Sequence, residues 1–325
     1  MNGIARRVLL VTLLGVVLYG VFVVYTGVSQ MGTSLARFEW LAFVVALGLA
    51  CFNYWLRFLK WQYYLSRLQI GGIRALDSLL IFLSGFVLTV TPGKLGEVFK
   101  SVVLAKTHGV PVARTAPIVI ADRLTDVIAI VVLILIGGAS FPGGLPWALA
   151  GAAAVALGLL FILWQPPGLW LCARLERTPK LSKTAPKLRD ALASLRILAG
   201  PSALPLPVLL SVVGWGCEGV ALHTLLGGFQ SKVTLSLALF FYATSTLAGA
   251  LVPIPGGLGL VESMLREELV SVGGVDQATA TAAMILTRLA TLWWAVAVGF
   301  MALVALRFRF PKALKEQAAA EARMS

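Results

Sequence analysis

Charged residues, cysteine and histidine are scarce in this chain of 325 residues. Only 13% of the residues are charged, and there are three cysteines and two histidines. Cys51, Cys172 and Cys217 lie far apart and form no CxxC pair and no Cys/His spacing of a metal site. We therefore expect free thiols and no metal, and a secreted disulfide scaffold is excluded. The low charge content also excludes a soluble enzyme and a disordered chain.

Hydrophobic residues make up 59% of the sequence, and the mean hydropathy is +0.90. Several uncharged runs reach the roughly 20 residues that a helix needs to cross a bilayer. The first of these runs, residues 8–26, lacks an A-x-A cleavage site. It is therefore predicted to be a retained helix rather than a signal peptide. The predicted full spans are residues 8–26, 40–56, 116–137, 145–164, 204–226 and 278–306.

Two further apolar stretches are broken by proline and glycine. The first, residues 78–91, is too short to span a bilayer comfortably and ends at Pro92-Gly93. The second, residues 234–252, ends at a Pro/Gly-rich break at residues 253–257. Charged residues follow both breaks, which disfavours a second arm that faces lipid. Each stretch is therefore predicted to form a re-entrant helical hairpin.

The basic residues are distributed asymmetrically. Lys and Arg number 27 against 14 acidic residues, a formal charge of +13. With six spans and two hairpins that return to their own side, both termini share one side. Most basic residues, Arg57 and Lys60 among them, then fall in cytoplasmic segments, opposite Arg37, Lys232 and Arg266. The positive-inside rule thus explains the charge without nucleic acid, and we expect a multi-pass protein of the bacterial inner membrane with both termini cytoplasmic.

The sequence contains an internal repeat. The segment Pro-Gly-Lys-Leu-Gly at 92–96 is matched by Pro-Gly-Gly-Leu-Gly at 255–259, an offset of 163. Arg123-Leu124 is matched by Arg288-Leu289 at an offset of 165. Each half then holds three crossings, which places the two halves in opposite orientations. Inverted repeats with broken helices are typical of alternating-access transporters.

The predicted fold is an all-α polytopic membrane protein, with six full transmembrane helices and two re-entrant helical hairpins arranged as an inverted repeat. The first repeat covers residues 1–140 and the second covers residues 141–310, followed by a basic cytoplasmic tail at 311–325. The cytoplasmic loop 165–203 has leucines at helical spacing among basic residues. This pattern predicts an amphipathic helix on the membrane surface.

The hairpin breaks are candidate anion sites. A helix that begins inside the membrane presents unpaired N–H groups and partial positive charge, which attract anions. Glycine there would let a phosphate approach the backbone, although the same glycines could serve helix packing alone. The candidate break residues are Pro92, Gly93, Gly96, Pro255, Gly256, Gly257 and Gly259.

Charged residues within apolar segments are the other candidates, because such charges usually have a function or a partner. The predicted substrate-binding residues are Lys94, Glu97, Lys100, Asp122, Arg123, Asp126, Glu262 and Arg288. A structural alternative is that Arg123 bridges the two aspartates and locks two helices together. Arg288 needs a partner from outside its own span, and Glu218, Glu262 or a ligand phosphate are the candidates. Glu97 and Glu262 either pair with the two arginines or carry protons.

No enzyme signature accompanies these residues. The sequence lacks GxSxG, HExxH, a Walker A sequence and a paired acidic metal motif. We therefore expect a protein that is not an enzyme and that uses no cofactor.

The motifs resemble those of a known family. The segment 92–97, Pro-Gly-Lys-Leu-Gly-Glu, the segment 122–126, Asp-Arg-Leu-Thr-Asp, and the second break with Glu262 look like the lysylphosphatidylglycerol synthase transmembrane, or flippase-like, family. The best-known member is the multiple peptide resistance factor. The resemblance covers nearly the whole chain and is to the membrane domain of that type, without the soluble synthase domain of bifunctional members.

The resemblance implies translocation of a lipid with a charged or glycosylated head group between leaflets. The expected partner is a membrane lipid with a phosphate head group, either an anionic phospholipid or a polyprenyl-phosphate-linked sugar. The alternative is a non-transporting membrane partner or regulator of a lipid-modifying enzyme or glycosyltransferase. A third hypothesis is a membrane-embedded lipid transferase with Asp122 or Glu97 as its base.

Overall fold

The computed structural model describes residues 34–90, 96–138, 185–252 and 254–311, with isolated positions at 32, 146, 149–153 and 157. Every regular element in this part of the chain is helical. The predicted span 8–26 and most of the predicted span 145–164 lie outside the described residues.

Three helices are long and apolar enough to cross a membrane: α3 (Trp40–Arg67), α11 (Pro205–Gly228) and a continuous helix at Gln277–Arg309. The last consists of α14 (Gln277–Arg288), one π-helical turn (Leu289–Trp293) and α15 (Trp294–Arg309). A fourth predicted span corresponds to α7 (Pro117–Gly138), a helix of 22 residues. The structure thus confirms an all-helical membrane protein, while six spans stay a prediction.

Helix α3 extends further than the sequence suggested. It ends at Arg67 instead of residue 56, and Lys60 within it is only 1% exposed. The predicted end of this span at residue 56 is therefore wrong, because Arg57 and Lys60 continue the same helix; their cytoplasmic placement stays a prediction. Their charges are matched by two aspartates of α7, so the helix does not have to end at the membrane surface for them to be stabilised.

Two helix pairs occupy the predicted hairpin segments, and the first break, at residues 91–95, lies outside the described residues. The first consists of α4 (Ala75–Ser84), a 3₁₀ turn η1 (Gly85–Leu88) and α5 (Gly96–His108). The second consists of α12 (Leu235–Leu251), a 3₁₀ turn η3 (Pro255–Gly257) and α13 (Leu260–Ser271). Their insertion into a bilayer stays a prediction.

The second break requires glycine. Gly256, Gly257 and Gly259 have φ angles of 60°, 67° and 87°, a region that other L-residues rarely adopt. A Cβ at Gly256 would lie 3.2 Å from Cγ1 of Val90, at the tip of the first hairpin. These glycines therefore do more than pack helices: they permit the break, and one of them lets the two hairpin tips meet.

The two halves repeat the same order of elements: a long helix, a hairpin and a second long helix. The first long helices, α3 and α11, pack antiparallel. The start of α3 meets the end of α11, where Glu39 N–H donates to Gly228 O at 3.1 Å. The end of α3 meets the start of α11, where Arg67 Nη2 donates to Ser202 Oγ at 3.3 Å.

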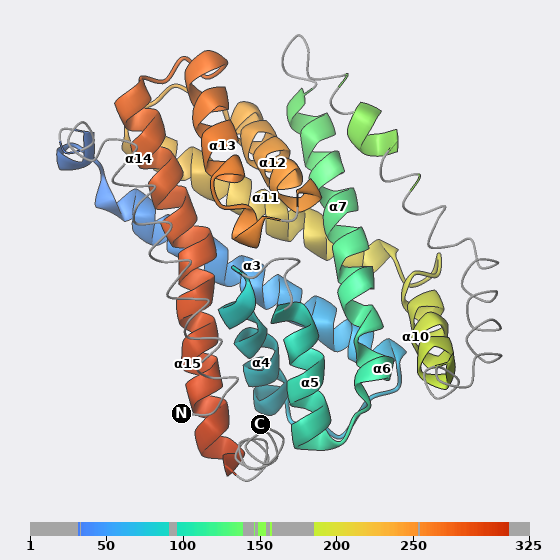
Figure 1. Ribbon diagram of the computed structural model, residues 1–325. Helices are drawn as coiled ribbons and strands as arrows, with labels where there is room; N and C mark the ends of the chain where they lie inside the picture. The colour runs from blue at the N-terminus through green and yellow to red at the C-terminus, as the bar shows by residue number, and fades with distance from the viewer. Residues whose placement is uncertain are drawn as a thin grey trace.

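The two hairpins lie at opposite ends of the molecule, α4–α5 in the lower half of Figure 1 and α12–α13 in the upper half, with α3 and α11 crossing between them. Each hairpin has its own apolar core, one with Phe82 and Leu104 and the other with Phe241 and Leu265. Helix α10 (Ala185–Leu198) forms within the predicted amphipathic loop and packs on α6 (Val112–Thr115) and α7. This arrangement brings Val90 of the first hairpin and Gly256 of the second break together near the centre of the molecule.

Candidate functional site

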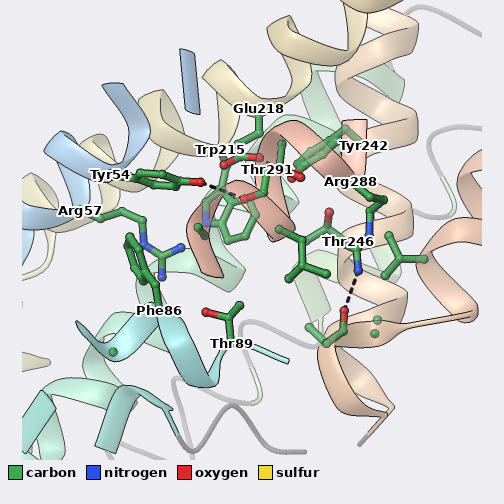
Figure 2. Close-up of a pocket in the computed structure, with 18 of the residues that line it drawn as sticks. Tyr54, Arg57, Phe86, Thr89, Trp215, Glu218, Tyr242, Thr246, Arg288 and Thr291 are labelled. Carbon is green, nitrogen blue, oxygen red and sulfur yellow. Dashed lines mark hydrogen bonds between the residues drawn. The ribbon is translucent and has the colours of Figure 1, made fainter. Parts of the chain in front are cut away.

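A cavity lies where the two hairpin tips approach each other (Figure 2). Phe86 and Thr89 line it from the first hairpin, and Thr246, Gly256 and Gly257 line it from the second. Its volume is about 110 Å³, several times the roughly 10–15 Å³ that one water needs. The cavity can therefore hold a small polar group such as a phosphate, but not the acyl chains of a lipid.

Cations dominate the charged lining of this cavity. Arg57 comes from α3, Lys100 from α5, Arg123 from α7 and Arg288 from α14, whereas Glu218 of α11 is the one carboxylate among the described lining residues. Residues of both halves thus contribute positive charge to one small space. Such a site favours an anionic ligand, because arginine and lysine form strong charge-assisted hydrogen bonds with phosphate oxygens.

Arg288 holds the second break in place. Its Nε lies 2.6 Å from Oε1 of Glu262, which is fully buried, and its Nη2 donates to the carbonyl oxygen of Gly256 at 2.8 Å. The other oxygen of Glu262 accepts from the N–H of Gly259 at 2.7 Å and caps the start of α13. The predicted pairing of Glu262 with Arg288 is confirmed.

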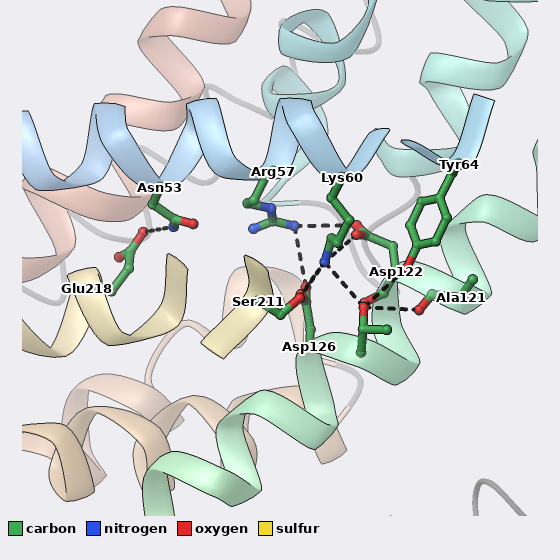
Figure 3. Close-up of polar contacts among 10 residues, drawn as sticks. Asn53, Arg57, Lys60, Tyr64, Ala121, Asp122, Asp126, Ser211 and Glu218 are labelled. Atoms are coloured by element: carbon green, nitrogen blue, oxygen red, sulfur yellow. Dashed lines mark hydrogen bonds and ion pairs between the residues drawn. The ribbon is translucent and has the colours of Figure 1, made fainter. Parts of the chain in front are cut away.

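The two aspartates of α7 form an ion cluster with α3 (Figure 3). Lys60 Nζ lies 2.6 Å from Oδ1 of Asp122 and 2.7 Å from Oδ1 of Asp126. Nη2 of Arg57 lies 3.7 Å and 3.5 Å from the other oxygens of the same two carboxylates. Two cations thus balance two anions within a buried part of the helix pair.

This cluster supplies Asp122 and Asp126 with ion-pair partners from another helix, and a bridge from Arg123 to both aspartates stays a prediction. Side chains at adjacent positions of a helix do not face each other, so Arg123 is poorly placed to hold Asp122. Lys60 and Arg57 contact Asp122 from another helix, and Arg123 lines the cavity.

Arg57 connects the ion cluster with the cavity. Its guanidinium lies on the aspartates at one side and 5.7 Å from the ring centre of Trp215 at the other. Figure 2 shows it projecting between Tyr54 and Phe86 into the cavity. A ligand in the cavity would therefore contact Arg57, whose positive charge is already partly offset by Asp122 and Asp126.

Lys100 is the cation with the fewest anionic contacts. Its side chain is 3% exposed, and Nζ lies 5.2 Å and 5.1 Å from the ring centres of Trp61 and Phe82. Within the described part of the chain, no carboxylate lies within ion-pair distance of it. A buried ammonium that rests only on aromatic faces is stabilised further by an anion in the cavity.

Hydroxyl groups and a carboxylate form another part of the wall. Tyr54 Oη donates to the carbonyl oxygen of Thr291 at 2.9 Å, and Tyr242 Oη donates to Oε2 of Glu218 at 2.7 Å. Asn53 Nδ2 donates to the other Glu218 oxygen at 2.6 Å. Tyr54, Glu218 and Tyr242 thus add polar surface to the cavity, and Asn53 holds Glu218 without lining the cavity itself.

The structure brings together many of the predicted site residues. Lys100, Arg123, Arg288, Gly256 and Gly257 line the cavity. Asp122 and Asp126 lie behind Arg57, and Glu262 lies behind Arg288. Gly96 begins α5, Pro255 begins η3 and Gly259 caps α13. Pro92, Gly93, Lys94 and the side chain of Glu97 lie outside the described residues, so their predicted roles stay predictions.

Sequence reasoning missed Arg57, Lys60 and Trp215, and it saw Glu218 only as a partner for Arg288. A signal for the two cations was present. Asp122 and Asp126 lie four residues apart in an apolar span and need two positive charges, and one neighbouring arginine supplies only one. The apolar pattern also continues after Lys60 with Trp61 and Leu65, which indicates that the helix continues.

The described residues contain no group of three or more potential metal ligands.

Comparison with known proteins gives a consistent result. Residues 11–299 match the family described as the lysylphosphatidylglycerol synthase TM region. A UPF0104 membrane protein of Pyrococcus horikoshii is 21% identical over 313 residues, which are 87% of this chain and 92% of that protein. Another of Methanocaldococcus jannaschii is 24% identical over 220 residues, 66% of this chain and 91% of that protein.

Proposed function

The chain belongs to the family of the lysylphosphatidylglycerol synthase transmembrane region, and we propose that it moves a lipid between membrane leaflets by binding its phosphate head group in the central cavity. The observation that carries this proposal is the convergence of four cations from both halves on one small space between the hairpin tips. The lipid of this proposal is an anionic phospholipid or a polyprenyl-phosphate-linked sugar.

The size and the charge of the cavity support a head-group site. Its volume of about 110 Å³ accommodates a phosphate but leaves the acyl chains outside, where hydrocarbon solvates them. Lys100 has no carboxylate partner in the described structure, so a phosphate diester would supply the missing negative charge. Arginine adds paired N–H donors that match phosphate oxygens.

The helix arrangement supports alternating access. We propose that the two hairpins insert into the bilayer from opposite sides and that their tips meet near its middle. The antiparallel packing of α3 and α11 and the close approach of Val90 to Gly256 agree with this geometry. Rocking of one half against the other about the central cavity would then open it to each leaflet in turn.

The proposal assigns no chemical reaction and no cofactor to the chain. It places the protein in the inner membrane of a bacterial cell, with both termini on the cytoplasmic side and the basic segments facing anionic lipid head groups.

The test is a leaflet-exchange assay in reconstituted vesicles. Fluorescently labelled phosphatidylglycerol is incorporated, and dithionite added outside bleaches only the outer leaflet. Vesicles with the protein should lose the remaining fluorescence faster than empty vesicles. Lys100→Gln should slow this phase at least several-fold, because the cavity loses its least compensated cation. Lys232→Gln, at an exposed lysine in the turn before α12, is the matched control and should behave as wild type.

The alternative function, a non-transporting partner of a lipid-modifying enzyme, gives a different result. Binding of the labelled lipid without any exchange above empty vesicles, with phosphatidylglycerol and with a polyprenyl-phosphate-linked sugar, would contradict transport and favour that alternative.

A further inference from the structure

Glu218 is a buried carboxylate in the wall of the cavity. It lies on α11, one of the three helices able to cross a membrane, and it is 4% exposed. Among the described lining residues it is the only acidic one, and it faces four cations across the same space. A role for it follows from how it differs from the other buried carboxylates.

The other acidic residues near the cavity are held by cations at short distance. Asp122 and Asp126 lie 2.6 Å and 2.7 Å from Lys60, and Glu262 lies 2.6 Å from Arg288. Glu218 instead accepts hydrogen bonds from two neutral groups, the Asn53 amide at 2.6 Å and the Tyr242 hydroxyl at 2.7 Å. In the described residues no cation lies within 4 Å of it.

A buried carboxylate without a close cation is costly when ionised and readily takes up a proton. The neighbouring charged and titratable groups decide whether Glu218 is ionised or protonated. The groups nearest to Glu218 are Tyr54 and Arg57 on α3, Tyr242 on α12, Arg288 on α14 and Cys217 on its own helix. Lys100 of α5 and Arg123 of α7 lie in the same cavity. The nearest arginines are already engaged, Arg57 by two aspartates and Arg288 by Glu262.

We propose that Glu218 is a proton-binding site coupled to the head-group phosphate, so that lipid binding is accompanied by uptake of one proton. This inference rests on the function proposed above. A proton from water forms an O–H bond with a carboxylate oxygen of Glu218 when the phosphate enters the cavity, and it returns to water when the phosphate leaves. The site can hydrogen-bond in both states, because the Tyr242 hydroxyl can donate to the carboxylate or accept from the carboxylic acid.

The position of Glu218 suits such a role in a duplicated protein. Its partner Asn53 lies 165 residues earlier, the same offset that relates Arg123 to Arg288 in the repeat. Residues in equivalent positions of two repeats can touch only near the axis that relates the repeats. A carboxylate near this axis can exchange protons with water on either side of the membrane as one half moves against the other. A carboxylate deep within one half would be closer to the water on one side only.

The expected pH dependence follows from linkage. A phosphate diester keeps its single negative charge over the pH range of the test, so its own ionisation contributes nothing. Because a negative phosphate favours the protonated form of Glu218, protonation must in turn favour phosphate binding. Affinity should therefore fall as the pH rises through the titration of Glu218, by up to about tenfold per pH unit for one proton.

The test is titration calorimetry of the detergent-solubilised protein with dihexanoyl-phosphatidylglycerol, from about pH 5 to about pH 8, in pairs of buffers with different heats of ionisation. Wild type should take up protons on binding and bind more weakly at the higher pH. Glu218→Gln should take up no proton, and its affinity should stay near the low-pH value of wild type at every pH, because glutamine resembles the protonated acid.

Glu268→Gln is the matched control. Glu268 accepts a hydrogen bond from Thr244 at 2.7 Å, has no cation within 4 Å in the described residues and does not line the cavity. It should bind and take up protons as wild type does. Tyr242→Phe provides a second variant if Glu218→Gln does not fold, and it should move the pH dependence to higher pH, because the ionised carboxylate loses a hydrogen-bond donor.

Two outcomes would overturn the coupling while leaving the proposed function intact. They are binding by wild type without proton uptake, and proton uptake that persists in Glu218→Gln. Absence of any binding by wild type, with folded protein shown by gel filtration, would instead contradict the proposed function and the coupling together.

Discussion

Asn53 and Glu218 are separated by 165 residues and joined by a hydrogen bond of 2.6 Å. Arg123 and Arg288, separated by the same number of positions, line one cavity from the two halves of the chain. The internal repeat seen in the sequence is thus expressed as proximity at the centre of the molecule.

Replacing Arg288 by lysine should impair transport although the charge is kept. Arg288 contacts Glu262 and the carbonyl oxygen of Gly256 through two different nitrogens, and a single ammonium cannot reproduce that fork. We expect a loss of at least tenfold in leaflet exchange at equal reconstituted protein. Arg307→Lys, at an exposed position of the same continuous helix, is the control. Wild-type exchange in Arg288→Lys would leave this arginine without a special role in transport.

Replacing Lys60 by methionine should lower the free energy of unfolding, and it should change the cavity little. Lys60 is 1% exposed and contacts both Asp122 and Asp126. Its removal takes the closest cation from both buried carboxylates, at a cost of about 3–5 kcal/mol. The free energy of unfolding in detergent, from denaturant titration, measures this loss. A value within 1 kcal/mol of wild type, on the order of ordinary surface substitutions, would show that the cluster contributes little to stability.

Replacing Gly256 by alanine should disturb the hairpin tips. Its φ of 60° costs a residue with a side chain about 1–2 kcal/mol, and the new Cβ would lie 3.2 Å from Val90. We expect lower thermal stability together with slower leaflet exchange. Gly48→Ala is the matched control, because Gly48 is a glycine of α3 with nothing within 4 Å of its Cβ position. Equal stability of the two variants would argue against a constrained break.

The opposite orientation of the hairpins can be tested by cysteine labelling in a variant without the native cysteines. Arg74 precedes α4 and Lys232 precedes α12, and both are exposed in equivalent turns of the two halves. Single cysteines at these positions should react with a membrane-impermeant maleimide from opposite sides of the membrane. Labelling of both from the same side would contradict the inverted repeat.

Much of the fold and part of the site follow from sequence alone. Runs of apolar residues identify membrane helices because a bilayer has a fixed thickness and its core cannot satisfy backbone polar groups. Proline and glycine mark the breaks because their backbone preferences are local. That Arg288 needs an acceptor from outside its own span also follows from sequence, and Glu262 is one of the three candidates.

Only the tertiary structure decides which charges meet. The sequence does not show that α7 brings two aspartates against Arg57 and Lys60 of α3. Glu218 acquires its character in the same way: Asn53 and Tyr242 donate to it, while the neighbouring arginines are held elsewhere. Composition and periodicity determine that the chain is a helical membrane protein, and they predict two broken hairpins. The cavity and its charge balance arise from helix packing, because electrostatic interactions depend on distances between residues that are remote in the chain.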